Sequence, residues 1–261
     1  MPKKILTQIY EIQTPSEAEW MLSAGVDHVG SVLLSESDWK KPRIRETILA
    51  VQSGGARSSL IPLFNTPDTV FEALDYYGPD MVHFCETLPL DPGNDDGFCE
   101  RLLAVQEGVR QRYGQIQIMR SIPIAPPGMA DSDRVLALAR LFEPLSDWFL
   151  TDTLCVAGPG EAPGEQPVSG FVGITGKTCD WTVAARLVRD STIPVILAGG
   201  LSPENVCQGC LAVAPAGVDS CTLTNALDGN KTPVRFKKDP QRVRRFVAET
   251  RRAQAMINQD K

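Results

Sequence analysis

The sequence predicts an α/β fold, a single closed (β/α)8 barrel, from three observations. Stretches typical of strands and of helices alternate about eight times along the 261 residues. Most successive strands begin about 25–35 residues apart, the length of a strand–helix–strand unit. The strands are apolar almost throughout, as parallel strands covered by helices are. Eight units in about 250 residues match a TIM barrel, although an open doubly wound sheet has the same periodicity.

Capping signals place the elements along the chain. The first helix is expected after Thr14, because a threonine hydroxyl caps free N–H groups and Pro15 suits a first helical position. Thr66-Pro67 repeats this signal, and Gly25 is typical of a helix end. The predicted strands cover residues 5–12, 29–34, 59–64, 81–85, 116–122, 147–152, 195–198 and 217–223. The predicted helices cover residues 14–24, 44–52, 66–77, 97–113, 131–142, 181–189, 205–214 and 240–254.

The composition argues against several classes of function. A net charge of −6 and a pI of about 5.1 disfavour nucleic acid and anionic membranes as partners. No stretch approaches the roughly 20 apolar residues of a membrane span, and the first residues lack the pattern of a secretory signal. The seven scattered cysteines are typical of reduced thiols, and Cys207-x-x-Cys210 falls inside a predicted helix. We expect a cytoplasmic monomer or homodimer with no cofactor and no metal.

Residues 1–261 are interpreted as one domain, because no linker or change of composition divides them. The longest predicted loop, at about 153–171, follows the sixth strand and contains Gly158-Pro159-Gly160 and Pro163-Gly164. Loops of this length are usually either functional or disordered, so a lid is one interpretation. In a barrel, the site lies at the carboxyl ends of the strands.

A phosphate cradle is predicted after the seventh strand. The buried run 194–198 ends at Gly199-Gly200, where backbone N–H groups can face a ligand without side chains in the way. Ser202 and Pro203 then suit the cap and first position of a helix, whose amino end favours anions. The alternative is an ordinary tight turn between a strand and a helix.

Several segments together resemble the phosphoribosylanthranilate isomerase family, barrel enzymes of tryptophan biosynthesis that carry out an Amadori rearrangement. In the carboxyl-terminal half, the resemblance rests on Gly173-Ile174-Thr175-Gly176-Lys177-Thr178-Cys179-Asp180-Trp181, on residues 195–206, on Gly217-Val218-Asp219-Ser220 and on Lys238-Asp239-Pro240. The amino-terminal half agrees more loosely, at Ala24-Gly25-Val26-Asp27, Lys41-Pro42-Arg43, Leu63-Phe64-Asn65 and Asp80-Met81-Val82-His83.

This resemblance implies roles for individual residues. Asp152, at the end of strand six, matches the general acid that opens the sugar ring, and Arg43 matches the arginine that pairs with the substrate's carboxylate. The residues matching the loops that hold the sugar phosphate or shape its pocket are Gly176, Gly199, Gly200, Asp219 and Ser220. The hydroxyl of Thr222 is expected to assist, since the glycine and acid of the family's last loop are absent here.

The catalytic base departs from the family's pattern. The family has a cysteine in a Lys-x-Cys-Gly run on strand one, and here Tyr10 takes that place in Gln8-Ile9-Tyr10-Glu11. A phenol is a poorer base than a thiol at neutral pH. On strand four, His83 and Cys85 share one face by the strand period of two. We hypothesise that one of them has taken over proton transfer or that the chemistry has changed; the alternative is that both are packed core residues.

The sequence therefore predicts an isomerase-type enzyme acting on a small phosphorylated sugar or its arylamine adduct, with an altered base or substrate. One alternative is a barrel that binds a phosphorylated ligand without catalysis. Another is a lyase or epimerase acting on a different phosphate ester. A likeness of fold does not by itself decide among these functions.

Overall fold

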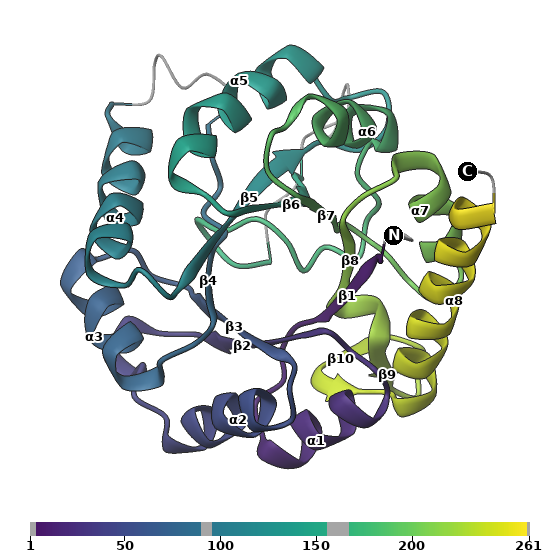
Figure 1. The fold of residues 1–261 in the computed structure, drawn as a ribbon, viewed down its shortest axis with the longest axis horizontal. Helices are drawn as coiled ribbons and strands as arrows, with labels where there is room; N and C mark the ends of the chain where they lie inside the picture. The colour runs from purple at the N-terminus through teal and green to yellow at the C-terminus, as the bar shows by residue number, and fades with distance from the viewer. Residues whose placement is uncertain (1–3, 90–95, 156–166, 260–261) are drawn as a thin grey trace.

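The computed structural model describes residues 4–89, 96–155 and 167–259, and these form a closed barrel of eight parallel strands surrounded by helices (Figure 1). Neighbours in the sequence are neighbours in the barrel, and β8 pairs with β1 to close it, from Leu6↔Gly217 to Ile9↔Ser220. The strands are β1 (Leu6–Ile9), β2 (His28–Leu33), β3 (Arg57–Pro62), β4 (Met81–Phe84), β5 (Gln117–Ile124), β6 (Trp148–Thr153), β7 (Val195–Leu197) and β8 (Gly217–Ser220). The predicted closed barrel is confirmed.

The helices form the outer ring. They are α1 (Pro15–Ser23), α2 (Pro42–Ser53), α3 (Pro67–Tyr77), α4 (Phe98–Arg112), α5 (Ser132–Phe142), α6 (Trp181–Asp190), α7 (Val206–Val213) and α8 (Pro240–Gln259). Thr14 caps α1 as expected, its hydroxyl accepting the Glu17 N–H at 3.2 Å. Short 3-10 turns cover Glu36–Asp38, Glu143–Leu145 and Thr222–Thr224. No helix of the described segments is long and apolar enough to cross a membrane.

Apolar packing occurs on both sides of the strands. Between strands and helices lie large clusters that include Phe142, Phe149 and Phe246, each fully buried. Inside the barrel a smaller cluster includes Met81, Met119 and Ile196. This interior is a packed core at its base, so a ligand site can open only toward one end.

Two predicted boundaries after strand seven are wrong. Ser202 does not cap a helix: its hydroxyl accepts the N–H of Glu204 at 3.1 Å within a turn, and α7 begins only at Val206. The side chain of Asn205 holds this turn, since its amide donates to Gly200 O at 2.9 Å and its carbonyl accepts the Ser202 N–H at 2.8 Å. The eighth strand ends at Ser220 rather than at residue 223.

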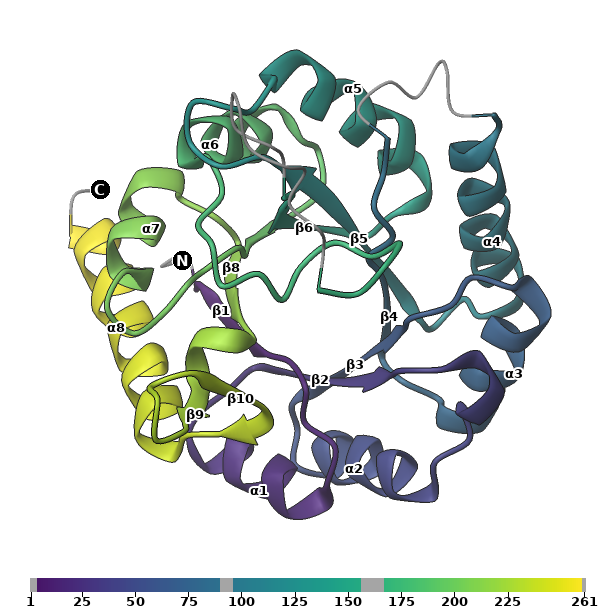
Figure 2. The same ribbon diagram turned by 180° about the vertical axis from the view of Figure 1, so that it is seen from behind.

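A small antiparallel hairpin, β9 (Asn225–Leu227) and β10 (Pro233–Lys238), lies between β8 and α8 and was not predicted. Its first strand has only three residues, and the alternation of apolar and polar residues in its second covers only Val234-Arg235-Phe236-Lys237. Figure 2 shows the hairpin beside one end of the barrel, together with residues 167–180 before α6, which cross the barrel opening. Of the predicted loop at 153–171, residues 156–166 lie outside the described residues.

Candidate active site

Two adjoining cavities open at the carboxyl ends of the strands. The first, here the glycine cavity, is lined by Gly176, Gly199, Gly200, Ser220 and Thr222, among others. The second, the apolar cavity, is lined mainly by aliphatic and aromatic side chains. The residues that line both cavities are Asp152, Ile174, Asp219 and Cys221. Two carboxyl groups therefore stand where a polar and an apolar compartment meet.

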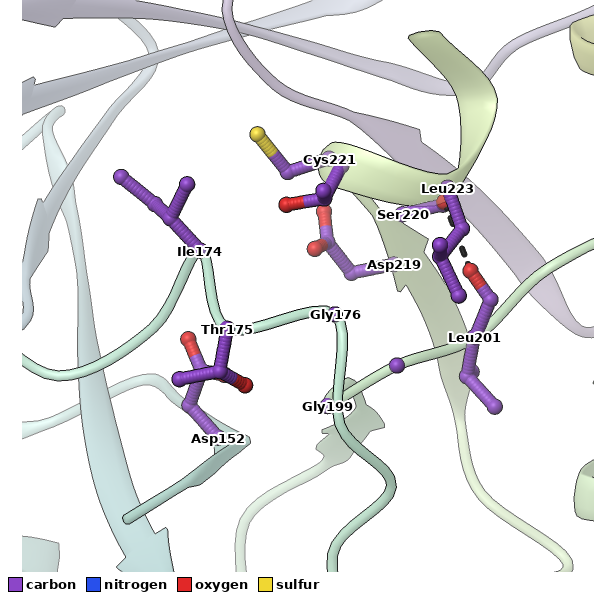
Figure 3. Close-up of a pocket in the computed structure, with 12 residues that line it drawn as sticks. Asp152, Ile174, Thr175, Gly176, Gly199, Leu201, Asp219, Ser220, Cys221 and Leu223 are labelled. Atoms are coloured by element: carbon purple, nitrogen blue, oxygen red, sulfur yellow. Dashed lines mark hydrogen bonds between the residues drawn. The ribbon is translucent and has the colours of Figure 1, made fainter. Parts of the chain in front are cut away.

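The glycine cavity offers donors to an anion. Within the described part of the chain, the backbone N–H groups of Gly176, Gly199 and Gly200 donate to no other residue. The hydroxyl oxygen of Thr222 is buried and likewise has no partner among those residues. Ser220 links β8 to the loop after β7, because its hydroxyl donates to Leu201 O at 2.8 Å (Figure 3). Unpaired buried donors are costly, which favours a ligand that accepts their hydrogen bonds.

Only glycine fits at position 200. Its φ is +60°, and a Cβ there would lie 2.5 Å from the Lys177 carbonyl carbon. We expect Gly200→Ala to push residues 177–178 away and to weaken binding of inorganic phosphate at least tenfold, measured by calorimetry. Gly78→Ala is the matched control, since Gly78 has φ +53° with nothing within 4 Å of its Cβ position. It shares the backbone strain of about 1–2 kcal/mol but should bind phosphate normally. Equal affinities in both variants would contradict this role.

The segment 167–180 roofs both cavities. The Val172 N–H donates to Cys85 O at 2.8 Å, and the hydroxyl of Thr153 donates to Lys177 O at 2.6 Å. The Asp180 N–H donates to Ala125 O at 3.0 Å. Gly173, at φ +115°, sits against Asp152, because a Cβ there would lie 2.3 Å from Asp152 Oδ2. The roof therefore shields the Asp152 carboxyl from water.

This shielding changes the acidity of Asp152. Burial raises its pKa to about 7, although its Oδ1 accepts the Thr153 N–H at 2.8 Å, which acts in the opposite direction. Burial and then the neighbouring Asp152 charge raise the pKa of Asp219 to about 8. Near neutral pH, the two carboxyl groups thus retain a proton that ordinary aspartates would have lost. Such perturbed groups in a cleft are typical of functional sites.

The strand-one and strand-four candidates face inward but bind each other. The Tyr10 hydroxyl lies 2.6 Å from Ser59 Oγ and 2.8 Å from His83 Nδ1, and His83 Nε2 lies 2.9 Å from Ser121 Oγ. Burial lowers the pKa of His83 to about 3 and raises that of Tyr10 well above its usual value. Both side chains line the apolar cavity, yet their polar atoms are already engaged.

Cys85 also lines the apolar cavity, and its pKa is raised by burial and then by the nearby Glu86 carboxylate. Arg43, by contrast, lies exposed in the first turn of α2 and lines neither cavity. The structure thus brings together ten of the eleven predicted site residues and leaves Arg43 apart from them.

Two polar residues of the site were missed from the sequence. Gln8 Nε2 donates to Asp219 Oδ1 at 3.2 Å. Glu11 lines the apolar cavity, is 1% exposed and forms an ion pair with Arg235 of β10. The sequence signal for Glu11 was a charged residue in an apolar run, at the place of the family's glycine. The structure shows why glycine suits this place, since Glu11 has a φ of +64°. Among the described residues, no group of three potential metal ligands is present.

The comparison with known proteins agrees with this geometry. Residues 147–222, which carry Asp152, the glycines and β8, match the family model described as N-(5'-phosphoribosyl)anthranilate (PRA) isomerase. The enzyme of that name from Methanothrix thermoacetophila is 31% identical over 230 residues, covering 87% of this chain and 92% of the relative. The chain belongs to the PRA isomerase family.

Solved structures of the family share the fold at lower identity. Phosphoribosylanthranilate isomerase from Thermotoga maritima superposes with a TM-score of 0.68 at 18% identity, covering 95% of this chain and 99% of that one. A second family structure, with a TM-score of 0.66 at 16% identity over 95% and 99% of the chains, was solved with reduced 1-(o-carboxyphenylamino)-1-deoxyribulose 5-phosphate. The family's barrel is thus retained here, while its strand-one cysteine is not.

Proposed function

We propose that this protein is an isomerase that converts N-(5'-phosphoribosyl)anthranilate into its ketose, the Amadori step of tryptophan biosynthesis. The observation that supports the proposal is the pair of adjoining cavities, one polar and one apolar, at the carboxyl ends of the strands. A compartment with free backbone donors suits a phosphate, and an adjoining apolar compartment suits an aryl ring. Asp152 stands between them, where the sugar of such a substrate would lie.

Asp152 acts as the general acid in this proposal. Its proton, retained by burial, goes to the furanose ring oxygen while the bond from that oxygen to C1 breaks, and the amine nitrogen forms a C=N bond to C1. The phosphate is held by the glycine cavity, through Gly176, Gly199, Gly200 and the hydroxyl of Thr222. No lysine or arginine is among the described residues lining either cavity, so neutral donors supply the binding.

The test is complementation of a strain that requires tryptophan because it lacks this isomerase, together with an assay of the purified protein on the same substrate. Growth and turnover are expected. If the folded protein gave neither, but phosphosugars raised its melting temperature, it would be a phosphate-ligand-binding barrel instead. Turnover of a different phosphate ester alone would favour a lyase or epimerase.

Arg43 is proposed to contact the anthranilate carboxylate, as the family resemblance implies, by reaching toward the substrate from the first turn of α2. Its side chain is exposed and forms no ion pair with another described residue, so it is available to a ligand. We expect Arg43→Ala to raise KM roughly tenfold, as a partly solvated charge-assisted pair would. Arg45→Ala, two residues along α2, is the control, since Arg45 donates to Tyr76 O at 2.9 Å.

A substrate analogue with aniline in place of anthranilate distinguishes binding of the carboxylate by Arg43 from a structural role of Arg43. Arg43→Ala should not change KM for this analogue, because it lacks the carboxylate. An equal rise in KM for both substrates would assign Arg43 a structural role, and no rise for either would remove it from the site.

A further inference from the structure

The rearrangement requires a base as well as an acid. After the ring opens, a proton must leave C2, and its electron pair forms a C1=C2 bond while the C=N bond to C1 becomes a C–N single bond. A proton is then added at C1 and the C2 hydroxyl loses its own, which leaves the ketone. No electrons are exchanged with an outside partner. The group that takes the C2 proton must be deprotonated, must face the sugar and must have a free lone pair.

The side chains nearest the lost cysteine do not meet these requirements. The Tyr10 hydroxyl and both nitrogens of His83 are engaged in one chain of hydrogen bonds that runs from Ser59 to Ser121. Burial keeps the Tyr10 phenol protonated. The Cys85 thiol faces the apolar cavity, but burial and the adjacent Glu86 also keep it protonated.

Asp219 faces the site and has a free lone pair, and it is deprotonated whenever the proton that the two aspartates share lies on Asp152. It comes from β8, two strands from the β6 strand that carries Asp152, it is 7% exposed, and it lines both cavities. Figure 3 shows the two carboxyl groups entering the glycine cavity from different strands, Asp152 from β6 and Asp219 from β8. Asp219 Oδ1 accepts the Gln8 amide at 3.2 Å, while Oδ2 has no hydrogen-bond partner among the described residues.

A contact between Gln8 and His28 helps to fix the position of Asp219. The carbonyl oxygen of Gln8 lies 3.2 Å from His28 Nδ1, and burial lowers the pKa of His28 to about 4, so that a neutral ring donates there. Gln8 is thereby oriented with its amide toward Asp219. One carboxylate oxygen is fixed, and the other is left toward the mouth.

We propose that Asp219 is the base that removes the C2 proton, working with Asp152 as the acid, in place of the family's strand-one cysteine. This assignment rests on the proposed isomerase function. A carboxylate in this position would repel a phosphate rather than bind it, so the role of Asp219 is proton transfer rather than phosphate binding. The two aspartates form a coupled pair with one proton between them near neutral pH.

The charged and titratable groups around Asp219 suit this role. They are Asp152 from β6, Lys238 from β10, Tyr10 from β1 and Cys221 after β8. Lys238 favours the ionised form of Asp219 and Asp152 disfavours it. Lys238 is itself fixed by donating to Cys221 O and Asn225 Oδ1, both at 2.6 Å.

The experiment compares Asp219→Asn with the wild type and with Asp190→Asn, a matched control at the carboxyl end of α6. We expect Asp219→Asn to lower kcat by roughly 10²–10⁴-fold with KM changed less than threefold. The fall of kcat/KM at low pH, which reports the base, should disappear in that variant, while Asp190→Asn keeps the wild-type profile. Asp219→Ala should regain activity when formate is added, because formate supplies the missing carboxylate.

The possible outcomes distinguish failure of the proposed isomerase function from failure of the assignment of Asp219 as the base. If the wild type does not convert the substrate, the proposed function fails and the base assignment fails with it. If the wild type is active and Asp219→Asn keeps more than a tenth of kcat, only the base assignment is overturned. Loss of activity without formate rescue and without a change in the pH profile would also overturn it, since a structural defect behaves in that way.

Discussion

Replacing Asp152 with asparagine is expected to lower kcat by roughly 10²–10⁴-fold while KM changes only a few-fold. Asparagine has nearly the same shape and still faces the roof at Gly173, so the substrate should bind. The asparagine amide, however, is not acidic enough to protonate the ring oxygen. Steady-state kinetics on the purified variant measure both constants, with Asp190→Asn as the unaffected control. A folded Asp152→Asn protein with undiminished kcat would remove Asp152 from the chemistry.

The same variant should be more stable than the wild type in mild alkali. Burial raises the pKa of Asp152 from 3.8 to about 7 in the folded state, so between about pH 4 and pH 7 the folded state binds more protons than the unfolded state. The resulting loss of stability is absent below about pH 4, grows as pH rises toward 7 and is complete above it. Asparagine avoids this loss. We expect a higher melting temperature for Asp152→Asn at pH 8 and no gain at pH 4.

The second large effect is on folding, at the ion pair between Arg120 and Glu86. Both side chains are at most 2% exposed, and the guanidinium lies between the rings of Phe84 and Phe142, 5.1 Å and 4.9 Å from their centroids. Arg120 Nε also donates to Gln106 Oε1 at 2.7 Å. Glu86→Ala would leave the arginine's charge buried without a partner, which costs about 3–5 kcal/mol.

Thermal unfolding measures this loss, and the expected fall in melting temperature is roughly 10 °C. The double variant Glu86→Ala/Arg120→Met should recover most of it, since no buried charge remains. Glu249→Ala, which removes a partly exposed partner of the exposed Arg252, should change little. Glu86 also pairs with Phe171 through a backbone bridge, so a loosened roof should raise KM as well. A melting temperature equal to that of the wild type would contradict the assignment.

Much of the candidate site could be predicted because it lies at strand ends. Asp152, Gly199, Gly200 and Asp219 follow apolar runs, and the barrel brings the ends of all such runs to one face. Arg43 lies in a first helical turn instead, where its neighbours in sequence say little about the direction of a long side chain. The hairpin and Arg235 were missed because one strand has only three residues and the alternation in the other, Val234-Arg235-Phe236-Lys237, is too short to distinguish a strand from a loop.

The sequence by itself determined the barrel, because eight apolar strands with helices between them can bury their surfaces in few other ways. It also determined the family, through short motifs whose spacing survives in the loops. Only the tertiary structure decided which polar groups are free to act. Tyr10 and His83 satisfy each other across the barrel, whereas Asp152 and Asp219 are drawn together under a roof that excludes water. Hydrogen-bond satisfaction and burial depend on residues that are far apart in the sequence, as Gln8 and Asp219 are at 211 positions, and local sequence does not reveal such contacts.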